Sequence, residues 1–255
     1  MEIPRRHNLI RELRQTNCAD CVLNPICLPP AIEEGEIQQL DDIITRNRPL
    51  ARGGMLFDEG MPFEAVFAVR SGAIKTCSST PSGEEQVTGF YLPGEIVGLD
   101  SIGNPSGYYG STAIALETTA VCALPFDALE DLASKLPSLQ RHLFQLLSSE
   151  IRADQQIMQL VGRRTAEERI ATFLLTLAAR YKRRKLSENQ LHLPMSRSDI
   201  ANHLGLALET VSRLFTRLQT QEVLRVNGRD VEIIDRKRLL ELANGGAEAV
   251  ASCGS

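Results

Sequence analysis

The chain has 255 residues, of which 43% are hydrophobic and 24% charged, and a formal net charge of −4. This length and composition allow two folded domains with sizeable cores and exclude a wholly disordered chain. No apolar run approaches the roughly 18 residues of a membrane span, and no secretion or lipidation signal is present. We therefore expect a cytoplasmic protein with no membrane partner.

The charge is divided unevenly along the chain. Residues 1–160 hold 12 basic and 21 acidic side chains, a balance of −9, whereas residues 161–240 hold 16 basic and 9 acidic side chains, a balance of +7. The residues from Glu241 onward add −2, which gives the total of −4. An acidic first part joined to a basic second part is typical of a sensory domain followed by a nucleic-acid-binding domain.

Three of the six cysteines lie close together in the stretch NCADCVLNPICL (17–28). The alternatives are local disulfides or a few core thiols without a ligand. Disulfides fit badly because cytosolic thiols stay reduced, so Cys18, Cys21 and Cys27 are better interpreted as metal ligands. Zinc and iron–sulfur clusters both take four thiolates, so a fourth cysteine is required from elsewhere. The spacing C-x2-C-x5-C is not that of a common zinc ribbon and contains no histidine, which favours a cluster. Prolines in and after the stretch bar a long helix and predict a loop around the ligand.

A helix and a set of strands are predicted next. Residues 33–46 carry apolar residues at helical spacing on an acidic background and predict a covering helix. Between residues 49 and 125, short apolar runs alternate with Gly, Pro and Ser turns, which predicts an antiparallel β-roll rather than a parallel sheet. The expected strands are residues 55–57, 65–70, 72–77, 86–91, 95–99 and 111–124.

Residues 138–164 predict a long helix with the a/d spacing of a coiled-coil seam. The seam positions are Phe144, Leu147, Ile151, Asp154, Met158 and Val161. In a homodimer the two Asp154 carboxylates would approach each other across the two-fold axis, which disfavours association and makes the dimer easy to switch. The alternative is a helix packed on its own domain, with Asp154 exposed at its edge.

The basic part predicts a helix-turn-helix. Residues 165–184 form an amphipathic pattern that begins with a capping box of Thr165 and Glu168. The stretch MSRSDIANHLGLALETVSRLFTRLQ (195–219) then predicts two helices joined at Gly205, the second of which would bury Val211, Leu214, Phe215 and Leu218. Double-stranded DNA is the expected partner of the outward residues Glu209, Ser212, Arg213, Thr216 and Arg217, and of Ser196 and Arg197 at the start of the first helix.

These residue types suit sequence readout. In the major groove an arginine pairs with guanine and a glutamate accepts from cytosine, and each good contact discriminates by roughly 1–3 kcal/mol. His203, on the first helix, is expected to be a surface residue or a phosphate contact rather than a metal ligand. Residues 222–235 predict a hairpin that turns at Asn227 and Gly228, a wing whose arginines would contact phosphate. The alternative is a helical hairpin with a merely charged outer face, which the basic surroundings disfavour.

In this order, the parts resemble the CRP/FNR family of bacterial transcription regulators, and more narrowly its oxygen-sensing FNR/ANR branch. The supporting motifs are the cysteine spacing and EEQVTGFYLPGEIVGLD (84–100), ALETTAVCALPF (115–126), EIRADQQ (150–156) and LETVSRLFTR (208–217). The resemblance implies an α+β fold and no enzyme. Its expected parts are a cysteine-rich segment (1–30), a cyclic-nucleotide-binding-like β-roll (31–134), a dimerisation helix (135–164), a winged helix-turn-helix (165–243) and a disordered tail (244–255).

The resemblance also implies a ligand, a target and partners. From the residues alone the fourth thiolate is open between Cys77, Cys122 and Cys253, the last in a Gly/Ser/Ala tail; the family motif falls on Cys122. The resemblance implies a [4Fe–4S] cluster. In the family, loading of this cluster drives homodimerisation, and its degradation by oxygen reverses the dimerisation. The dimer is then expected to control anaerobic gene expression. The implied DNA target is a palindrome of TTGAT-like half-sites. The implied protein partner is RNA polymerase, through the hairpin at 79–84.

Three other functions compete with oxygen sensing. Cyclic-nucleotide binding in this fold uses a Gly-Glu pair followed by an arginine, but the residues after Gly94 and Glu95, VGLDSIGNPSGYYG, contain no arginine, so no cyclic nucleotide is expected. Zinc held by the same four cysteines would leave a DNA-binding protein without an oxygen response. An enzyme is disfavoured because no catalytic triad, phosphate-binding glycine loop or nucleotide fingerprint occurs.

Overall fold

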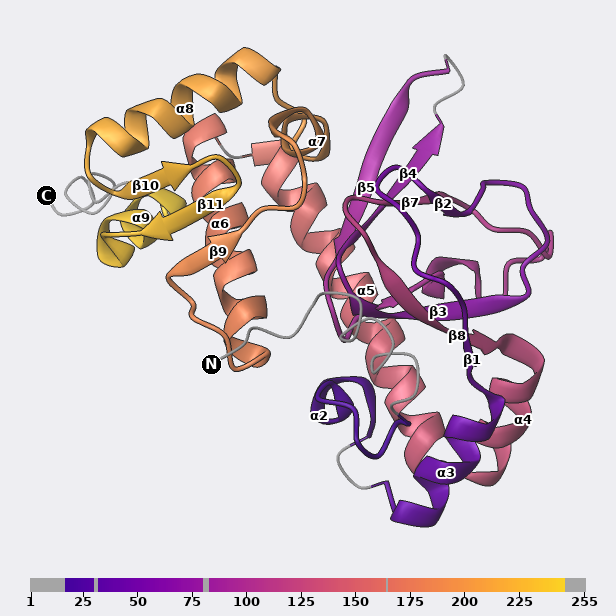
Figure 1. Ribbon diagram of the computed structural model, residues 1–255. Helices are drawn as coiled ribbons and strands as arrows, with labels where there is room; N and C mark the ends of the chain where they lie inside the picture. Colours follow the sequence, from indigo (N-terminus) through magenta and orange to yellow (C-terminus); the bar gives the residue numbers. More distant parts are fainter. Residues whose placement is uncertain (1–16, 30–31, 80–82, 164, 246–255) are drawn as a thin grey trace, which may run out of the picture. The chain divides into compact units, whose positions relative to one another are not determined.

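The computed structural model describes residues 17–29, 32–79, 83–163 and 165–245 (Figure 1). The described chain forms two compact units. One contains the residues up to Ser78 together with Phe90–Ser149, and the other contains Ser79–Gly89 and the residues from Glu150 onward. Within the described ranges, no helix is both long enough and apolar enough to cross a membrane.

Two four-stranded sheets form the β-roll, with strand orders β1-β8-β3-β6 and β2-β7-β4-β5. The strands are β1 (Thr45–Arg46), β2 (Met55–Phe57), β3 (Ala65–Ser71), β4 (Ile74–Ser79), β5 (Glu85–Tyr91), β6 (Ile96–Val97), β7 (Thr112–Ala115) and β8 (Ala120–Pro125). The pairings of β8 with β1 and β3, of β3 with β6, and of β7 with β2 and β4 are antiparallel, as predicted.

Two of the predicted strands differ in extent. The run 111–124 is two strands, because a turn at residues 116–119 separates β7 from β8; the hydroxyl of Thr119 donates to the carbonyl of Ala73 at 3.0 Å and supports this turn. The run 95–99 is the short β6, after which Leu99–Ser101 forms a 3₁₀ helix.

Helices α3 (Glu34–Ile43) and α4 (Phe126–Lys135) share a core with β3 and the start of α5. The helix predicted over 33–46 is confirmed in α3, which begins with a capping box of Glu33 and Glu36 and gives way to β1. Helix α4 was not predicted. Its apolar residues Leu129, Leu132 and Ala133 face the core at helical spacing, but ten residues between a strand and a longer helix give only a short pattern.

Helix α5 (Pro137–Arg163) confirms the predicted long helix. Its first turns pack into the core through Leu139, Leu143 and Leu146. Seam residue Leu147 is partly buried against the same core, whereas Phe144, Ile151 and Met158 are 63%, 58% and 67% exposed. Leu147 therefore lies beside the core of the first unit, and the other described seam residues, including Asp154, are exposed or largely so. The side chain of Val161 lies outside the described residues.

The second unit contains the winged helix-turn-helix, with the helices α6 (Ala166–Arg183), α7 (Arg197–His203), α8 (Leu208–Thr220) and α9 (Arg236–Ala243) and the strands β9 (Gln190–His192), β10 (Leu224–Asn227) and β11 (Asp230–Ile233). The capping box predicted at the start of α6 is present, and Ser196 and Asp199 form a second one at the start of α7. The predicted wing is the antiparallel pair β10–β11, which turns at Gly228 with a φ of 61°. Strand β9, which was not predicted, adds a third strand through β11.

Candidate functional site

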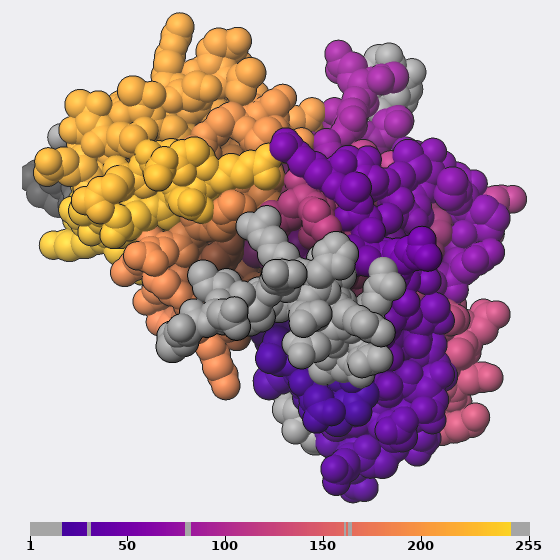
Figure 2. Space-filling model, viewed as in Figure 1, coloured from indigo at the N-terminus to yellow at the C-terminus, as the bar shows by residue number. Residues whose placement is uncertain are grey.

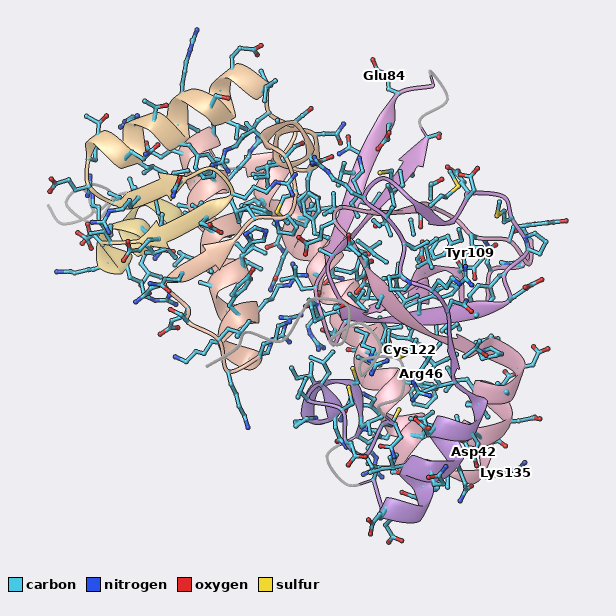
Figure 3. All side chains as sticks on the ribbon, in the orientation of Figure 1. Asp42, Arg46, Glu84, Tyr109, Cys122 and Lys135 are labelled. Carbon is cyan, nitrogen blue, oxygen red and sulfur yellow. The ribbon has the colours of Figure 1, made fainter. Side chains whose placement is uncertain are left out.

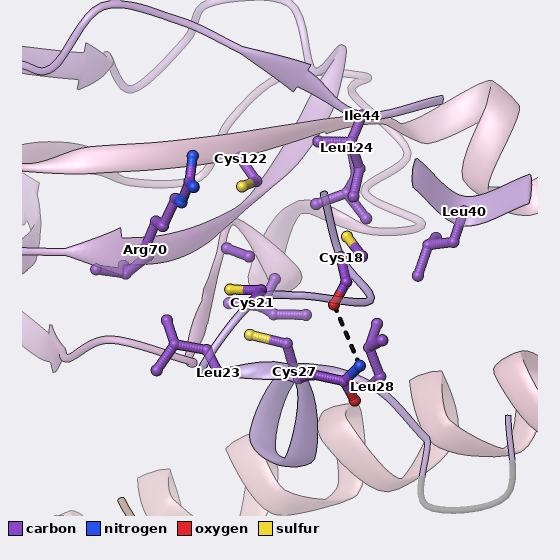
Figure 4. A pocket seen from close by; sticks show the side chains of 14 residues that line it. Cys18, Cys21, Leu23, Cys27, Leu28, Leu40, Ile44, Arg70, Cys122 and Leu124 are labelled. Carbon is purple, nitrogen blue, oxygen red and sulfur yellow. Dashed lines mark hydrogen bonds between the residues drawn. The ribbon is translucent and has the colours of Figure 1, made fainter. Parts of the chain in front are cut away.

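The cysteine stretch folds as tight turns followed by one helical turn, α2 (Asn24–Cys27). The carbonyl oxygen of Cys18 accepts hydrogen bonds from the backbone N–H of Cys21 at 3.4 Å and from Nδ2 of Asn24 at 3.1 Å. The backbone N–H of Asn24 in turn donates to the carbonyl of Cys21 at 2.9 Å. These bonds fold the chain back on itself, as the predicted loop requires, and bring the three thiols into one small region (Figure 4).

A fourth thiol comes to this region from β8. Cys122 lines the same pocket as Cys18, Cys21 and Cys27, in a space of about 520 Å³ that is partly open to solvent (Figure 4). Leu23, Leu28, Leu40, Ile44, Ile96 and Leu124 make most of the remaining wall apolar. Cys77 is buried on β4, outside this pocket, and Cys253 lies outside the described residues. Of the three candidates for the fourth thiolate, only Cys122 joins the other three among the residues that the structure describes.

The thiols are not arranged as a ready-made site for a single ion. In the described part of the chain, no three Cys, His, Asp or Glu side chains converge closely enough to hold one metal ion. Burial, followed by the hydrogen bond with Asp41, raises the pKa of the Cys18 thiol to about 12. Burial also raises the pKa of Cys122, although the nearby charges of Arg46 and Arg70 oppose this. Both thiols therefore remain protonated until a bound metal lowers their pKa.

Two charged residues beside Cys18 were missed by sequence reasoning. Asp41 on α3 accepts a hydrogen bond from the backbone N–H of Cys18 at 2.7 Å and is also paired with Arg46 on β1. Burial acts to raise the pKa of Asp41, but the hydrogen bonds from Arg46 and Cys18 outweigh it and leave the pKa below its ordinary value. Asp41 is therefore ionised and holds Arg46 beside Cys18.

The cysteine stretch is also in contact with α5 and with the β-roll. Nε2 of His142, on α5, lies 3.2 Å from the carbonyl oxygen of Cys27. Leu28 belongs to the core cluster that contains Leu139 of α5. Ile26 packs so closely on Gly94 that a Cβ on this glycine would lie 2.8 Å from its Cγ2. A change in the cysteine stretch can therefore reach the start of the seam helix directly.

Helix α8 presents the polar face that was expected from the sequence. Val211, Leu214, Phe215 and Leu218 are buried, while the remaining face is exposed and carries Glu209, Ser212, Arg213, Thr216 and Arg217. This confirms the predicted facing of the helix. In Figure 2 the orange atoms of α8 form an uncovered ridge on the surface of its unit. Arg217 lies 3.5 Å from Glu167 and is 56% exposed at its side chain, so it too remains accessible.

Three predicted contacts on α7 are engaged inside their own unit. Ser196 caps the helix, accepting from the backbone N–H of Asp199 at 3.0 Å. The guanidinium carbon of Arg197 lies 3.4 Å from the ring centroid of Phe215. Burial lowers the pKa of Arg197 to about 10. The surface position expected for His203 is wrong, because this residue is only 8% exposed and its Nδ1 lies 3.1 Å from the carbonyl of Val87.

Known proteins share both parts of this architecture. Residues 168–242 match the family described as the Crp-like helix-turn-helix domain, and residues 47–135 match the cyclic nucleotide-binding domain. Over 240 residues the chain is 51% identical to the transcriptional activator protein FnrA of Stutzerimonas stutzeri, covering 94% of this chain and 98% of FnrA. Over 239 residues it is 50% identical to the transcriptional activator protein anr of Pseudomonas aeruginosa, covering 94% and 97%.

A solved structure agrees with these matches. FixK2 from Bradyrhizobium japonicum is 34% identical to this chain and superposes on it with a TM-score of 0.70. The superposition covers 78% of this chain and 97% of FixK2. A β-roll, a long helix and a winged helix-turn-helix in this order define a DNA-binding transcription regulator rather than an enzyme. With relatives about half identical over nearly its whole length, the chain belongs to the CRP/FNR family, in the FNR/ANR branch. The predicted α+β fold class is confirmed with it.

Proposed function

We propose that this regulator acts in the cytoplasm as an oxygen sensor that activates anaerobic gene expression when Cys18, Cys21, Cys27 and Cys122 hold a [4Fe–4S] cluster. The observation that carries the proposal is the single pocket that these four cysteines line. Its residues fit the group, because iron–sulfur clusters are held by four cysteine thiolates and the rest of the lining is mostly apolar. When bound, the cluster ties the four thiolates together, and oxygen degrades it.

The signal would travel from the pocket to α5. A bound group that joins Cys27 to Cys122 restrains the carbonyl of Cys27, and with it the contact to His142. The exposed seam residues Phe144, Ile151 and Met158 then have a partner in the second protomer of a homodimer. Burying each such side chain contributes about 1.5–3 kcal/mol, while the two Asp154 carboxylates oppose association. Association also costs translational and rotational freedom and the ordering of side chains. These opposing terms reduce the net gain, which lets cluster loading decide between monomer and dimer.

The output would be DNA binding by α8. A two-fold dimer places two copies of this helix about one DNA turn apart, which suits a palindrome of TTGAT-like half-sites. Glu209, Ser212 and Arg213 lie on its exposed face and would contact the base edges. The proposed partner for activation is RNA polymerase, at the hairpin 79–84, of which residues 80–82 lie outside the described residues. No cyclic nucleotide is needed in this scheme.

Paired cysteine substitutions test the proposal. Cys122→Ser removes the ligand from β8, and Cys77→Ser, on β4 outside the pocket, is its matched control. After purification without air, we expect iron and acid-labile sulfide in the wild type and in Cys77→Ser, and neither in Cys122→Ser, which should also lose anaerobic promoter activation. A cluster and full activation retained in Cys122→Ser would contradict the ligand set. Zinc in place of iron in the wild type would support a regulator without an oxygen response.

A further inference from the structure

Arg46 places a positive charge beside two of the thiols of the cysteine pocket, in addition to Arg70, which is one of the residues that line the pocket. In the register of β1 and β8, Arg46 pairs with Cys122, which puts the two side chains on the same face of the sheet. Figure 3 labels both side chains, next to each other. Nη2 of Arg46 also lies 3.9 Å from Sγ of Cys18. A single guanidinium is therefore adjacent to two thiols that reach the pocket from distant parts of the sequence.

Asp41 fixes the position of this guanidinium. Its Oδ1 accepts hydrogen bonds from Nη2 of Arg46 and from the backbone N–H of Cys18. The same carboxylate therefore fixes the positions of both Arg46 and Cys18. The side chains of Arg46 and Asp41 are only 18% and 15% exposed, and a pair buried to this degree is little screened by salt. Arg46 is thus held beside the pocket rather than free to turn into solvent.

One donor of Arg46 is unused. Its Nε is buried and has no hydrogen-bond partner within the described residues. Leaving a buried donor unpaired is unfavourable, and thiolate or sulfide sulfur in the pocket is an acceptor of the kind that would satisfy it. The unused donor and the register with Cys122 are separate observations: the first shows that Arg46 can form a further hydrogen bond, and the second places its side chain on the same face of the sheet as a pocket thiol.

We infer that Arg46, held by Asp41, is a positioning residue of the metal centre, and that its guanidinium is a counter-charge to the thiolates of Cys18 and Cys122. It sets how tightly the cluster is retained and at what potential it is reduced. The inference rests on the proposed function. The positive charge of the cluster core offsets only part of the charge of four thiolates, so the loaded pocket carries a net negative charge, which is unfavourable in a partly buried site without a partner. Net charge and hydrogen bonds to sulfur set the reduction potential of such clusters.

Three variants, each purified without air, test this role. Arg46→Met removes the positive charge. Asp41→Asn removes the opposing negative charge but keeps the side-chain oxygen that accepts from Arg46, so the guanidinium stays in place. Arg48→Met makes the same charge change as Arg46→Met on an exposed arginine. The measurements are iron loss to a chelator and the reduction midpoint potential of the cluster. We expect Arg46→Met to hold iron about 10–100-fold less tightly, the usual effect of removing a group that supports a metal ligand.

The potentials should shift in opposite directions. Without the positive charge of Arg46, adding an electron to the site is less favourable, so Arg46→Met should lower the midpoint potential. Removing the negative charge of Asp41 should raise it, and Arg48→Met should leave it unchanged. General damage to the pocket would not produce opposite shifts, so the sign separates a charge effect from a structural one.

Failure of the inference is distinct from failure of the proposed function. A coloured, iron-loaded wild type with the same potential and iron retention in Arg46→Met would overturn the inference alone. A colourless wild type would overturn both. If Arg46→Met does not fold, the test rests on Asp41→Asn. A cluster midpoint potential that is unchanged or lowered in Asp41→Asn would contradict the proposed role of the Arg46–Asp41 pair.

Discussion

Ile151 lies in the middle of the exposed seam of α5, and Ile151→Ala tests whether that seam is a dimer interface. The side chain is 58% exposed in the single chain. The substitution removes three carbons, each contributing about 0.8 kcal/mol when buried. Scaled by the exposed fraction, the loss is about 1.4 kcal/mol per protomer, and because a two-fold interface contains the residue twice, about 2.8 kcal/mol per dimer. The dimer should dissociate about 100-fold more readily.

Sedimentation equilibrium of the cluster-loaded protein without air measures this dissociation constant directly. Alanine favours helix, so α5 should remain intact, and far-UV circular dichroism checks this. Leu186→Ala is the matched control, because it removes a side chain that is 54% exposed and lies outside α5. It should leave the dissociation constant unchanged. A loaded Ile151→Ala protein that dimerises as tightly as the wild type would refute the assignment of the seam.

Three further substitutions test the repulsion between the two Asp154 residues, the contact that links the cysteine pocket to α5, and the recognition of DNA bases. Asp154→Ala removes like charges from the seam, so the cluster-free variant should dimerise in solution; a monomeric mass at concentrations where the loaded wild type dimerises would show that Asp154 is not the restraint. His142→Ala removes the contact with Cys27 and should weaken the loaded dimer at unchanged iron content; equal loss of iron would mean that His142 only supports the pocket. Arg213→Ala should reduce, by about 1–3 kcal/mol, the difference in binding free energy between the preferred base and the other bases at one position of the half-site. Gel shifts with half-site variants measure this difference. If the substitution weakens binding to all sequences equally, Arg213 is a phosphate contact instead.

The outward face of α8 could be predicted because its pattern is local. Four apolar residues at helical spacing decide which side of the helix is buried, and the polar residues between them must then lie on the opposite, exposed side. The capping boxes and the glycine turn of the wing were predictable for the same reason, since each is a contact between neighbours in the sequence. The burial of His203 was not predictable, because it depends on Val87, which is distant in the sequence.

The cysteine pocket shows the opposite case. Three of its cysteines form a motif, but Cys122 could be singled out only through the family resemblance, because its place in the pocket depends on the order of strands in a sheet. Arg46 and Asp41 carry no motif at all. They meet because a two-residue strand pairs with β8 directly after a helix, and no periodicity in the sequence indicates so short a strand.

The most direct test of the oxygen switch is the visible absorption spectrum of protein purified without air, followed through air exposure together with binding to palindromic DNA. We expect a brown protein whose absorption and DNA affinity fall together and whose mass changes from dimer to monomer at the same rate. A colourless protein, or DNA binding that persists after the absorption is lost, would contradict the switch.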